Sequence, residues 1–574
     1  MTVKNNSHRA RIAGALLLVA MGGLMWRPIH EESATSDEPW ILAAGYTYCS
    51  GDGFRMHPDE PPLAKMWSAL PLLAMDISVS RETAALKDGS LVFRLARTWQ
   101  TDMRPRQAVL PAGAQNNWYF WPWIEGERFG ELFVYRDNDG ERLIVAGRIM
   151  QTALTLLTGV LIFLWTIELA GATAGVLALA MWCFNPVALA HGHLIQTDSG
   201  GALTVVMALW SYGCFLVRPS RGRVVIAGMA LGVAVVTKLS ALLLVPTYAL
   251  LACIRWGYPF VVKPSGRDWL RYSIAFAASA YLVLLVVYVP HWSPAPALTD
   301  AQAAALEVPE WFRLLRPVLV PADFFKAVVL LVGSARGGHH PGYLLGQWST
   351  DGWWYYYAIA ILLKSPIALL LLSAGGGLLF AKRLRGVPFE QLVPFVGATV
   401  FLAVAVMNRM NIGIRHLLPV YALLPIGIAA QTAVGPRLIR IVASLLCAWM
   451  AAVAVWAHPF YIEYFNEFAG GAKNGYQYLL DSNLDWGQDV KRLKRYLDQN
   501  QIQHIYLCYF GAQQAIDYYG ISNTRVFSDE AQQIHDGVLV VSAMALMQPE
   551  WSWLRHRQPV TRIGYTLFVY GPPG

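Results

Sequence analysis

Apolar segments recur along the chain at lengths that suit a lipid bilayer. A spanning helix needs about 20 mostly apolar residues, and fewer when its ends reach into the headgroup region. Eleven segments fit this description. They are 12–27, 144–168, 170–190, 200–217, 224–237, 239–254, 272–290, 354–378, 387–407, 417–432 and 438–457. We therefore predict an all-α polytopic membrane protein with about eleven transmembrane helices.

Clusters of Lys and Arg predict the orientation of these spans. The clusters occupy 4–11, 218–223, 255–271, 382–385 and 437–440. With eleven spans and a cytoplasmic N-terminus, every cluster lies on the cytoplasmic side, as the positive-inside rule requires. Ten spans would place the later clusters outside, so 224–254 is split into two short helices with Lys238 between them. No A-x-A site follows the first apolar segment, which favours an uncleaved anchor in the inner membrane.

Three large pieces then fall on the extracytoplasmic, periplasmic side. Two are loops within a transmembrane domain over 1–457, at 28–143 and 291–353. In the first loop, 38–50 and 61–77 read as helices lying in the membrane interface. The third piece, 458–574, combines an amphipathic pattern near 487–499 with the strand-like runs "HIYLCYFG", "GVLVVSAMAL" and "YTLFVYG", which predict a small α/β domain.

Composition supports this picture and narrows the function. The chain is 55% hydrophobic and 14% charged, whereas a soluble protein carries about a quarter charged residues. The net charge of +8 lies largely in the short clusters above, so it indicates orientation and not nucleic-acid binding. The six cysteines form no CxxC or Cys/His cluster; a Cys49–Cys508 bridge stays open as an alternative to free thiols.

An acid pair, Asp37 and Glu38, stands where the chain leaves the first span. Two interpretations are open. Asp37 can be the cap of a helix that begins with Glu38 and Pro39. Alternatively, a carboxylate held at the bilayer surface can act as a general base. Further along, Lys65 begins an interfacial apolar run, where it can meet a lipid phosphate or simply extend to the headgroup level.

Two outer turns between spans add polar groups. One holds His191, His193 and Asp198; further metal ligands are lacking nearby, so we expect no metal and favour Asp198 as part of a substrate site. The other holds Arg415 and His416, whose outer position runs against the positive-inside trend and calls for an anionic ligand.

Arg148, early in the second span, fits the same account, with an ion pair to Glu141 as the alternative. The tail opens with Asp481, Asp485 and Asp489 at helical spacing. That pattern suits either a solvated acidic face or a segment that recognises the acceptor or docks onto the first loop.

Several longer motifs resemble those of bacterial phospholipid-carrier-dependent glycosyltransferases. They are "SDEPWILAAGYTY", "GDGFRMHPDEPPLAK", "GWWYYYAIAILLKSPIALLLL", "NIGIRHLLPVY", "YFNEFAGGAKNGYQYLLDSNLDWGQDVKRLKRYL" and "IGYTLFVYG". Their order resembles the protein O-mannosyltransferases and the aminoarabinose transferases of lipid A, within the C-type (GT-C) superfamily. The resemblance implies a GT-C membrane core, no cofactor and no required metal.

The resemblance also implies roles for individual residues. It implies that Asp37 of the Asp37–Glu38 pair is the base, that Arg148 faces the donor phosphate, and that Asp198 belongs to the site. The family's His-Pro-Pro-Leu motif has Glu60 in place of its His, and His57 is a candidate substitute. The full set of donor-phosphate and substrate-binding candidates is Arg148, Lys65, Asp198, Arg415, His416, His57, Glu60 and Lys238.

The predicted activity is transfer of a sugar from a polyprenyl-phosphate carrier to an acceptor hydroxyl, with inversion and with Asp37 as general base. The partners are the carrier lipid, membrane lipids and an acceptor that is a glycan, a lipid or a protein. A lipid-linked-substrate transporter and a catalytically inert scaffold are the alternatives. A transporter would place ionisable groups near the bilayer midplane, whereas here they gather at the ends of the spans.

Overall fold

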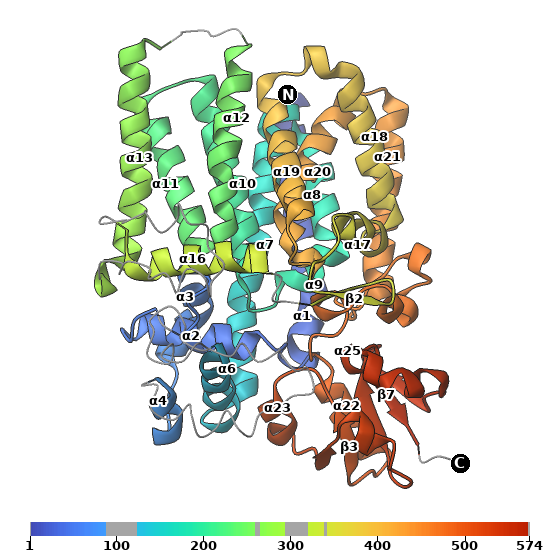
Figure 1. Cartoon of the computed structure of the whole chain (residues 1–574). Coiled ribbons are helices and arrows are strands. Elements are labelled where there is room, and N and C mark those ends of the chain that lie inside the picture. The colour runs from blue at the N-terminus through green and yellow to red at the C-terminus, as the bar shows by residue number, and fades with distance from the viewer. Residues whose placement is uncertain are drawn as a thin grey trace.

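The computed structural model describes residues 2–54, 56–87, 123–258, 264–292, 320–337 and 341–571. It is a bundle of long helices (Figure 1). One end of the bundle carries short helices and a small sheet, and the other end carries the connections between long helices. The long helices of the bundle are α1 (Thr2–Glu31), α7 (Gly140–Ala170), α8 (Ala172–Cys183), α10 (Thr197–Val217), α11 (Arg221–Thr237), α12 (Leu244–Trp256), α13 (Gly266–Tyr288), α18 (Ile367–Arg383), α19 (Phe389–Met407), α20 (Leu418–Ala433) and α21 (Arg437–Ala457).

All eleven predicted spans coincide with helices, although two are broken. Among the described residues, nine helices are long and apolar enough to cross a membrane, or ten if α8 and α9 (Pro186–Gly192) count as one bent span. That pair bends by 63°, and the Asn185 side chain caps α9 at the break. The segment predicted at 354–378 divides into α17 (Tyr356–Lys364) and α18 because Ser365 precedes a proline and takes an extended conformation.

The split predicted within 224–254 is confirmed. Helix α11 ends at Thr237, Lys238 is extended, and a 3₁₀ turn, η5 (Leu239–Leu243), leads into α12. Figure 1 shows the N-terminus and the α10–α11, α18–α19 and α20–α21 connections at one end of the bundle. The N-terminus and these connections carry basic clusters. The clusters therefore lie at the same end of the bundle, as the positive-inside rule predicts.

The other end carries the elements predicted to lie outside the membrane. The two helices predicted in the first loop are present as α2 (Glu38–Cys49) and as α3 (Leu63–Ala69) with its continuation η1 (Leu70–Ala74); that they lie in the membrane interface stays a prediction. The two helices touch closely, since a Cβ at Gly45 would lie 2.1 Å from the Lys65 carbonyl oxygen. The remaining elements here are α4 (Arg81–Lys87), α6 (Trp123–Glu131), η4 (Leu132–Arg136), α16 (Ala322–Gly337), β1 (Gly342–Leu344) and β2 (Gln347–Ser349).

The C-terminal region is a small α/β unit, as predicted. Its five strands run in the order β4-β3-β5-β7-β6, with β3 parallel to β4 and β5, and β7 antiparallel to β5 and β6. The predicted amphipathic helix is α22 (Val490–Gln499), whose Leu493 packs against the sheet core. The strands are β3 (Ile505–Cys508), β4 (Asn523–Arg525), β5 (Leu539–Ser542), β6 (Thr561–Ile563) and β7 (Leu567–Tyr570).

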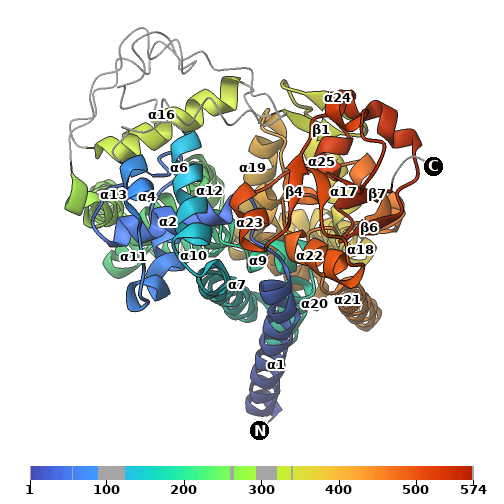
Figure 2. The ribbon, with the colours of Figure 1, turned by 90° about the horizontal axis from the view of Figure 1, so that it is seen from below.

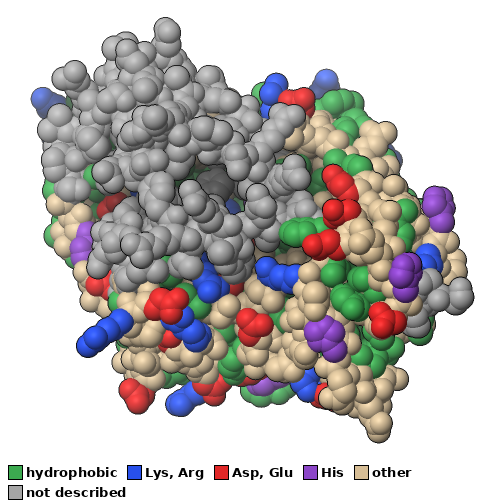
Figure 3. Space-filling view, turned by 60° about the horizontal axis from the view of Figure 1, so that its bottom comes forward, with side chains coloured by type: hydrophobic (Ala, Val, Ile, Leu, Met, Phe, Trp, Pro, Cys, Tyr) green, Lys and Arg blue, Asp and Glu red, His purple; other side chains and the backbone are tan. Residues whose placement is uncertain are grey.

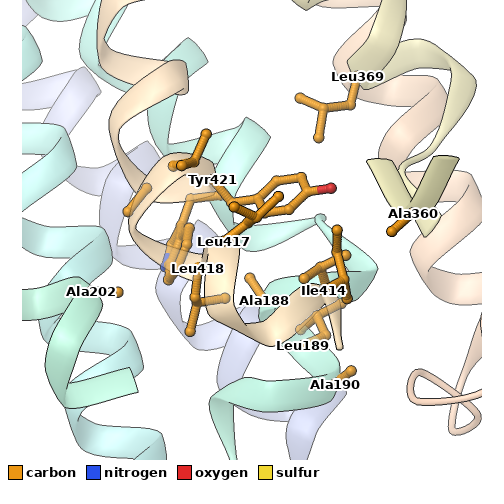
Figure 4. Packing of buried hydrophobic residues seen from close by; sticks show 14 of the residues in the cluster. Ala188, Leu189, Ala190, Ala202, Ala360, Leu369, Ile414, Leu417, Leu418 and Tyr421 are labelled. Atoms are coloured by element: carbon orange, nitrogen blue, oxygen red, sulfur yellow. The ribbon is translucent and has the colours of Figure 1, made fainter. Parts of the chain in front are cut away.

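The short helices of the first loop and the C-terminal unit lie against different long helices. Figure 2 shows α2, α4, α6 and α16 beneath α10 to α13, and the C-terminal unit beneath α17 to α21. Between them lies a buried apolar core at the ends of the spans. Ala188 and Leu189 of α9, Ile414 and Leu417 of η8 (Ile414–Leu417), and Tyr421 of α20 converge in it (Figure 4). This core supports the polar groups described next.

Candidate active site

Glu38 is a fully buried carboxylate whose two oxygens are both occupied. Its Oε1 accepts hydrogen bonds from Arg148 Nε at 2.8 Å and from the Ile195 amide at 3.0 Å. Its Oε2 accepts from Arg148 Nη2 at 2.7 Å and from the Thr35 amide at 2.8 Å. Burial alone would raise the pKa of Glu38, but the Arg148 cation and these hydrogen bonds hold that pKa below its ordinary value. The geometry therefore contradicts a catalytic role for Glu38 and gives it a structural one.

Arg148 cannot meet a donor phosphate in this arrangement. A guanidinium has five N–H groups, and all five are used. Two bind Glu38, and the other three bind the carbonyl oxygens of Ile29 at 3.0 Å, Glu32 at 2.9 Å and Ser33 at 3.0 Å. The predicted phosphate contact is corrected accordingly: Arg148 secures the turn between α1 and α2. The alternative partner, Glu141, pairs instead with Lys491 at 2.6 Å.

Asp37, one residue earlier, is presented in a different way. It occupies the N-cap position of α2, yet its side chain makes no capping hydrogen bond. The simple capping interpretation is therefore wrong. The carboxylate is 34% exposed and accepts a hydrogen bond from Arg415 Nη1 at 3.2 Å. Its other oxygen, Oδ1, accepts from Ser36 Oγ at 3.2 Å. Each oxygen thus accepts one long hydrogen bond and keeps a lone pair for a further donor, while the Glu38–Arg148 pair beside it holds the backbone.

Arg415 is the cation that faces Asp37. Its side chain is 11% exposed, and its guanidinium carbon lies 4.2 Å from the centre of the Trp486 ring, a cation–π contact. Its Nε is buried with no hydrogen-bond partner among the described residues. Arg148 uses all five of its N–H groups, whereas the Arg415 guanidinium donates only to Asp37 among the described residues. The backbone of η8 is held in place because Asn483 Oδ1 accepts the Ile414 N–H at 2.9 Å.

A second charged group joins the same site. Lys238, at the break between α11 and η5, donates to Asp198 Oδ1 at 2.7 Å and lies 3.6 Å from Glu60 Oε1. The charges of Arg415 and His416 act on Asp198, and those of Asp198 and Glu60 act on Arg415. Five of the predicted residues thus come together from five separate positions in the chain. We call Asp37, Glu60, Asp198, Lys238 and Arg415 the charged cluster.

Lys65 and His57 lie outside the charged cluster. Lys65 is fully buried, and its Nζ donates to the carbonyl oxygens of His57 at 2.6 Å and Glu60 at 2.7 Å. Burial lowers the pKa of Lys65 to about 8, although Asp59 and Glu60 oppose that shift. His57 is buried beside it, with Nδ1 2.9 Å from Asp59 Oδ1. Lys65 and His57 were both predicted to contact the substrate, and both predictions are corrected. Lys65 holds the 57–60 loop through its hydrogen bonds to two carbonyl oxygens, and His57 is buried inside that loop.

The histidines of the 185–201 turn have other partners. His193 Nε2 lies 3.0 Å from Glu32 Oε2, and the His191 ring lies 6.2 Å from that of Trp486. In the part of the chain that the structure describes, no three His, Cys, Asp or Glu side chains form a group that could hold a metal ion. Cys49 and Cys508 are both free thiols, so the disulfide left open above is not formed.

The 481–489 segment docks onto the loop that carries Asp37. The Ser33 and Ser36 amides donate to the carbonyl oxygens of Gln488 at 2.9 Å and Trp486 at 3.0 Å. The prediction of a solvated acidic face is therefore wrong, and the alternative prediction, that this segment docks onto the first loop, is confirmed. Asp485 is fully buried, accepts the Met544 N–H at 2.8 Å, and has its pKa raised to about 7 by that burial.

Trp486 was not foreseen as a site residue. Nothing in the sequence around this Trp indicates that it contacts Arg415, which lies about seventy residues earlier in the chain. On the part of the lower face that the described residues form, Lys, Arg, Asp and Glu side chains lie among one another (Figure 3).

One protein-family profile matches part of the chain. Residues 140–293 match the family profile of the dolichyl-phosphate-mannose-protein mannosyltransferases. This segment runs from α7 through α13 and therefore contains Arg148, Asp198 and Lys238. The match confirms, for this part of the chain, the resemblance to the protein O-mannosyltransferase group. No curated protein matches the sequence.

Solved structures that resemble the chain include two glycosyltransferases. Crystal structures of ArnT from Cupriavidus metallidurans, bound to undecaprenyl phosphate and in the apo state, align over 97% of this chain and 99% of theirs, at 12% identity and a TM-score of 0.43. The archaeal oligosaccharyltransferase AglB from Archaeoglobus fulgidus, in complex with an inhibitory peptide and a dolichol-phosphate, aligns over 94% of this chain and 71% of its own, at 11% identity and a TM-score of 0.43.

Proposed function

We propose that this protein is a membrane glycosyltransferase of the GT-C type. It moves a sugar from a polyprenyl-phosphate carrier to an acceptor hydroxyl, without a metal or other cofactor. The observation that carries the proposal is the Asp37–Arg415 pair: a part-exposed carboxylate 3.2 Å from a guanidinium that donates a hydrogen bond to no other described residue. The family match over 140–293 supports a lipid-phosphate sugar as the donor.

In the proposed reaction Arg415 binds the donor phosphate. The bond from the anomeric carbon to the phosphate oxygen breaks, and negative charge gathers on the departing lipid phosphate. A guanidinium is suited to grip phosphate with two parallel hydrogen bonds, and a cation positioned for the developing charge lowers the barrier. Lys238 adds positive charge nearby, partly balanced by Asp198 at 2.7 Å.

Asp37 acts as the general base. The acceptor hydroxyl transfers its proton to the carboxylate while its oxygen bonds to the anomeric carbon from the face opposite the phosphate, which inverts the configuration. Donor binding at Arg415 also releases Asp37 from its ion pair, so the base becomes available when the donor is in place. The transferred group is a hexose or pentose, and the acceptor is a glycan, a lipid or a protein.

The site belongs on the extracytoplasmic face of the inner membrane in this proposal. The basic clusters lie at the opposite end of the bundle from α2 and the C-terminal unit (Figure 1). By the positive-inside rule that opposite end is cytoplasmic. The N-terminus is then cytoplasmic, and the C-terminal unit and the charged cluster are periplasmic.

The test is transfer of a radiolabelled sugar from a polyprenyl-phosphate donor by the purified protein. Arg415→Ala should weaken donor binding at least about tenfold, and Arg409→Ala is the matched control. Arg409 lies on the same loop, is 57% exposed, and is 3.8 Å from its nearest carboxylate, on Asp351. Lipid translocation without transfer would overturn the proposal in favour of a transporter, and donor binding alone would favour a scaffold.

A further inference from the structure

Asp481 adopts a backbone conformation that aspartate seldom takes. It begins the 3₁₀ turn η11 (Asp481–Asn483) with φ at +56°, in the left-handed region. Asp tolerates this region better than most residues, yet the conformation still costs free energy and persists only where the surroundings impose it. Its Oδ1 accepts the Ser482 amide, which directs the carboxyl group within the turn.

The turn is fastened to the segment that carries Arg415. Ser482 Oγ donates to the Ile412 carbonyl oxygen at 2.9 Å, and Asn483 Oδ1 accepts the Ile414 N–H at 2.9 Å. The contact is close, since a Cβ at Gly413 would lie 2.0 Å from Ser482 Oγ. Asp481 is therefore held in a fixed position relative to Arg415.

Asp481 differs from the carboxylates of the charged cluster. Asp37 is paired with Arg415, while Asp198 and Glu60 share Lys238. Asp481 forms no ion pair in the described part of the chain, although the charges of Arg415 and Asp37 both act on it. Burial raises its pKa to about 6, and Arg415 opposes that shift. A half-buried carboxyl group with an unused oxygen thus stands beside the proposed phosphate site.

We propose that Asp481 binds hydroxyl groups of the donor sugar and thereby sets which sugar the enzyme accepts. The inference rests on the proposed function. A sugar joined to a phosphate at Arg415 lies one oxygen atom away from that phosphate, so its hydroxyls fall beside the groups that surround Arg415. A carboxyl group accepts several hydrogen bonds, and a site that bonds a substrate hydroxyl rejects analogues that lack it. Asp37 remains for the acceptor.

The test compares binding of two lipids, a bare polyprenyl phosphate and the same lipid carrying the sugar that the wild type transfers. Asp481→Gly removes the carboxyl group at a φ that glycine adopts freely, so the fold is preserved. This variant should lose about 10- to 100-fold in affinity for the sugar-linked lipid and should bind the bare lipid as the wild type does. Asp481→Asn, which keeps one acceptor oxygen, should fall between the two.

Gln501→Gly is the matched control. Gln501 has φ at +55° in the C-terminal unit and is exposed, so this substitution relieves the same backbone conformation away from the site and should change neither affinity. In turnover assays, the preference between two donor sugars that differ in one hydroxyl should shrink in Asp481→Gly.

An equal loss with both lipids would overturn the inference, because Asp481 would then act only by positioning Arg415. Unchanged binding of both lipids would overturn it as well. If the wild type transfers sugar from no polyprenyl-phosphate donor, the proposed function fails and this inference fails with it; that result is seen in the wild type alone, before any variant is made.

Discussion

Asp37 and Glu38 are neighbours in the chain, and the structure predicts opposite consequences for their isosteric amides. Glu38→Gln leaves the Arg148 guanidinium fully buried without its counter-charge. Removing one partner of a buried ion pair costs about 3–5 kcal/mol, whereas proteins are stable by only about 5–15 kcal/mol. Solvent does not screen this pair, whose side chains are 0% and 1% exposed. We therefore expect Glu38→Gln to lose about a fifth or more of the net stability.

Asp37→Asn should leave the fold almost unchanged and abolish most of the activity. Its carboxylate is 34% exposed, so solvent screens the pair and its loss should cost about 1 kcal/mol; the charges of Asp198 and Glu60 still act on Arg415 when Asp37 is neutral. Loss of a general base lowers the rate by roughly 10²–10⁴-fold. Asp351→Asn, at a carboxylate that is 85% exposed, is the control and should change neither property.

Both quantities can be measured on the same detergent-solubilised samples, by thermal unfolding and by sugar transfer. The pH gives a second check. The pKa of Glu38 is lowered in the folded protein, so its stabilising effect is present above its unfolded pKa of about 4.3 and is lost as pH falls through the folded value. The difference between wild type and Glu38→Gln should accordingly shrink in acid. Wild-type stability with lost turnover in Glu38→Gln would refute the structural assignment and return Glu38 to the chemistry.

Three further predictions concern residues around the site. Trp486→Ala removes the ring beneath Arg415 and should weaken binding of bare polyprenyl phosphate about 5- to 30-fold, for a cation–π contact of about 1–2 kcal/mol, whereas Trp354→Ala, at an exposed ring, should not. Lys65→Met leaves two carbonyl oxygens unpaired and should destabilise the protein by about 2 kcal/mol or more without changing lipid binding. Asp485, with its pKa raised to about 7, binds a proton more tightly in the folded state, so its titration should lower wild-type stability by about 2–3 kcal/mol between pH 5 and pH 8; in Asp485→Asn the fall should be smaller than in the wild type by that amount.

Each of these has a contrary outcome. Equal lipid binding by Trp486→Ala and the wild type would separate the ring from the function of Arg415. A specific loss of lipid binding in a stable Lys65→Met protein would restore Lys65 to the phosphate site. Parallel pH profiles for Asp485→Asn and the wild type, in thermal unfolding, would show that Asp485 is ionised in the folded protein.

The architecture could be predicted from the sequence because membrane helices are defined by local composition. Length and apolarity located every span, and the positive-inside rule separated α11 from α12 at Lys238. The interfacial helices and the strands β3, β5 and β7 followed from amphipathic and alternating patterns. The breaks at Asn185 and Ser365 were missed because a proline in an apolar run still permits a continuous span.

The site was only half predictable, because local sequence does not say which partner a charged group has. Arg148 was expected to face an anion or Glu141, yet its partner is Glu38, 110 residues away. Lys65 looked like an interfacial cation, but the fold of the 57–60 loop encloses it. Asp37, Asp198 and Arg415 were singled out by their places in outer turns, and the first two also by the family resemblance; that they lie near one another could be seen only in the three-dimensional structure.

The contact between the 33–36 loop and the 486–490 segment has a consequence for biosynthesis. Ser33 Oγ bonds to the Gly487 carbonyl oxygen and to the Val490 amide, which are 454 and 457 positions further along the chain. The ribosome makes these partners only after the last long apolar helix, α21, which ends at Ala457. The loop that carries Asp37 is among the first segments to be synthesised, yet it acquires this contact only when nearly the whole chain has been made.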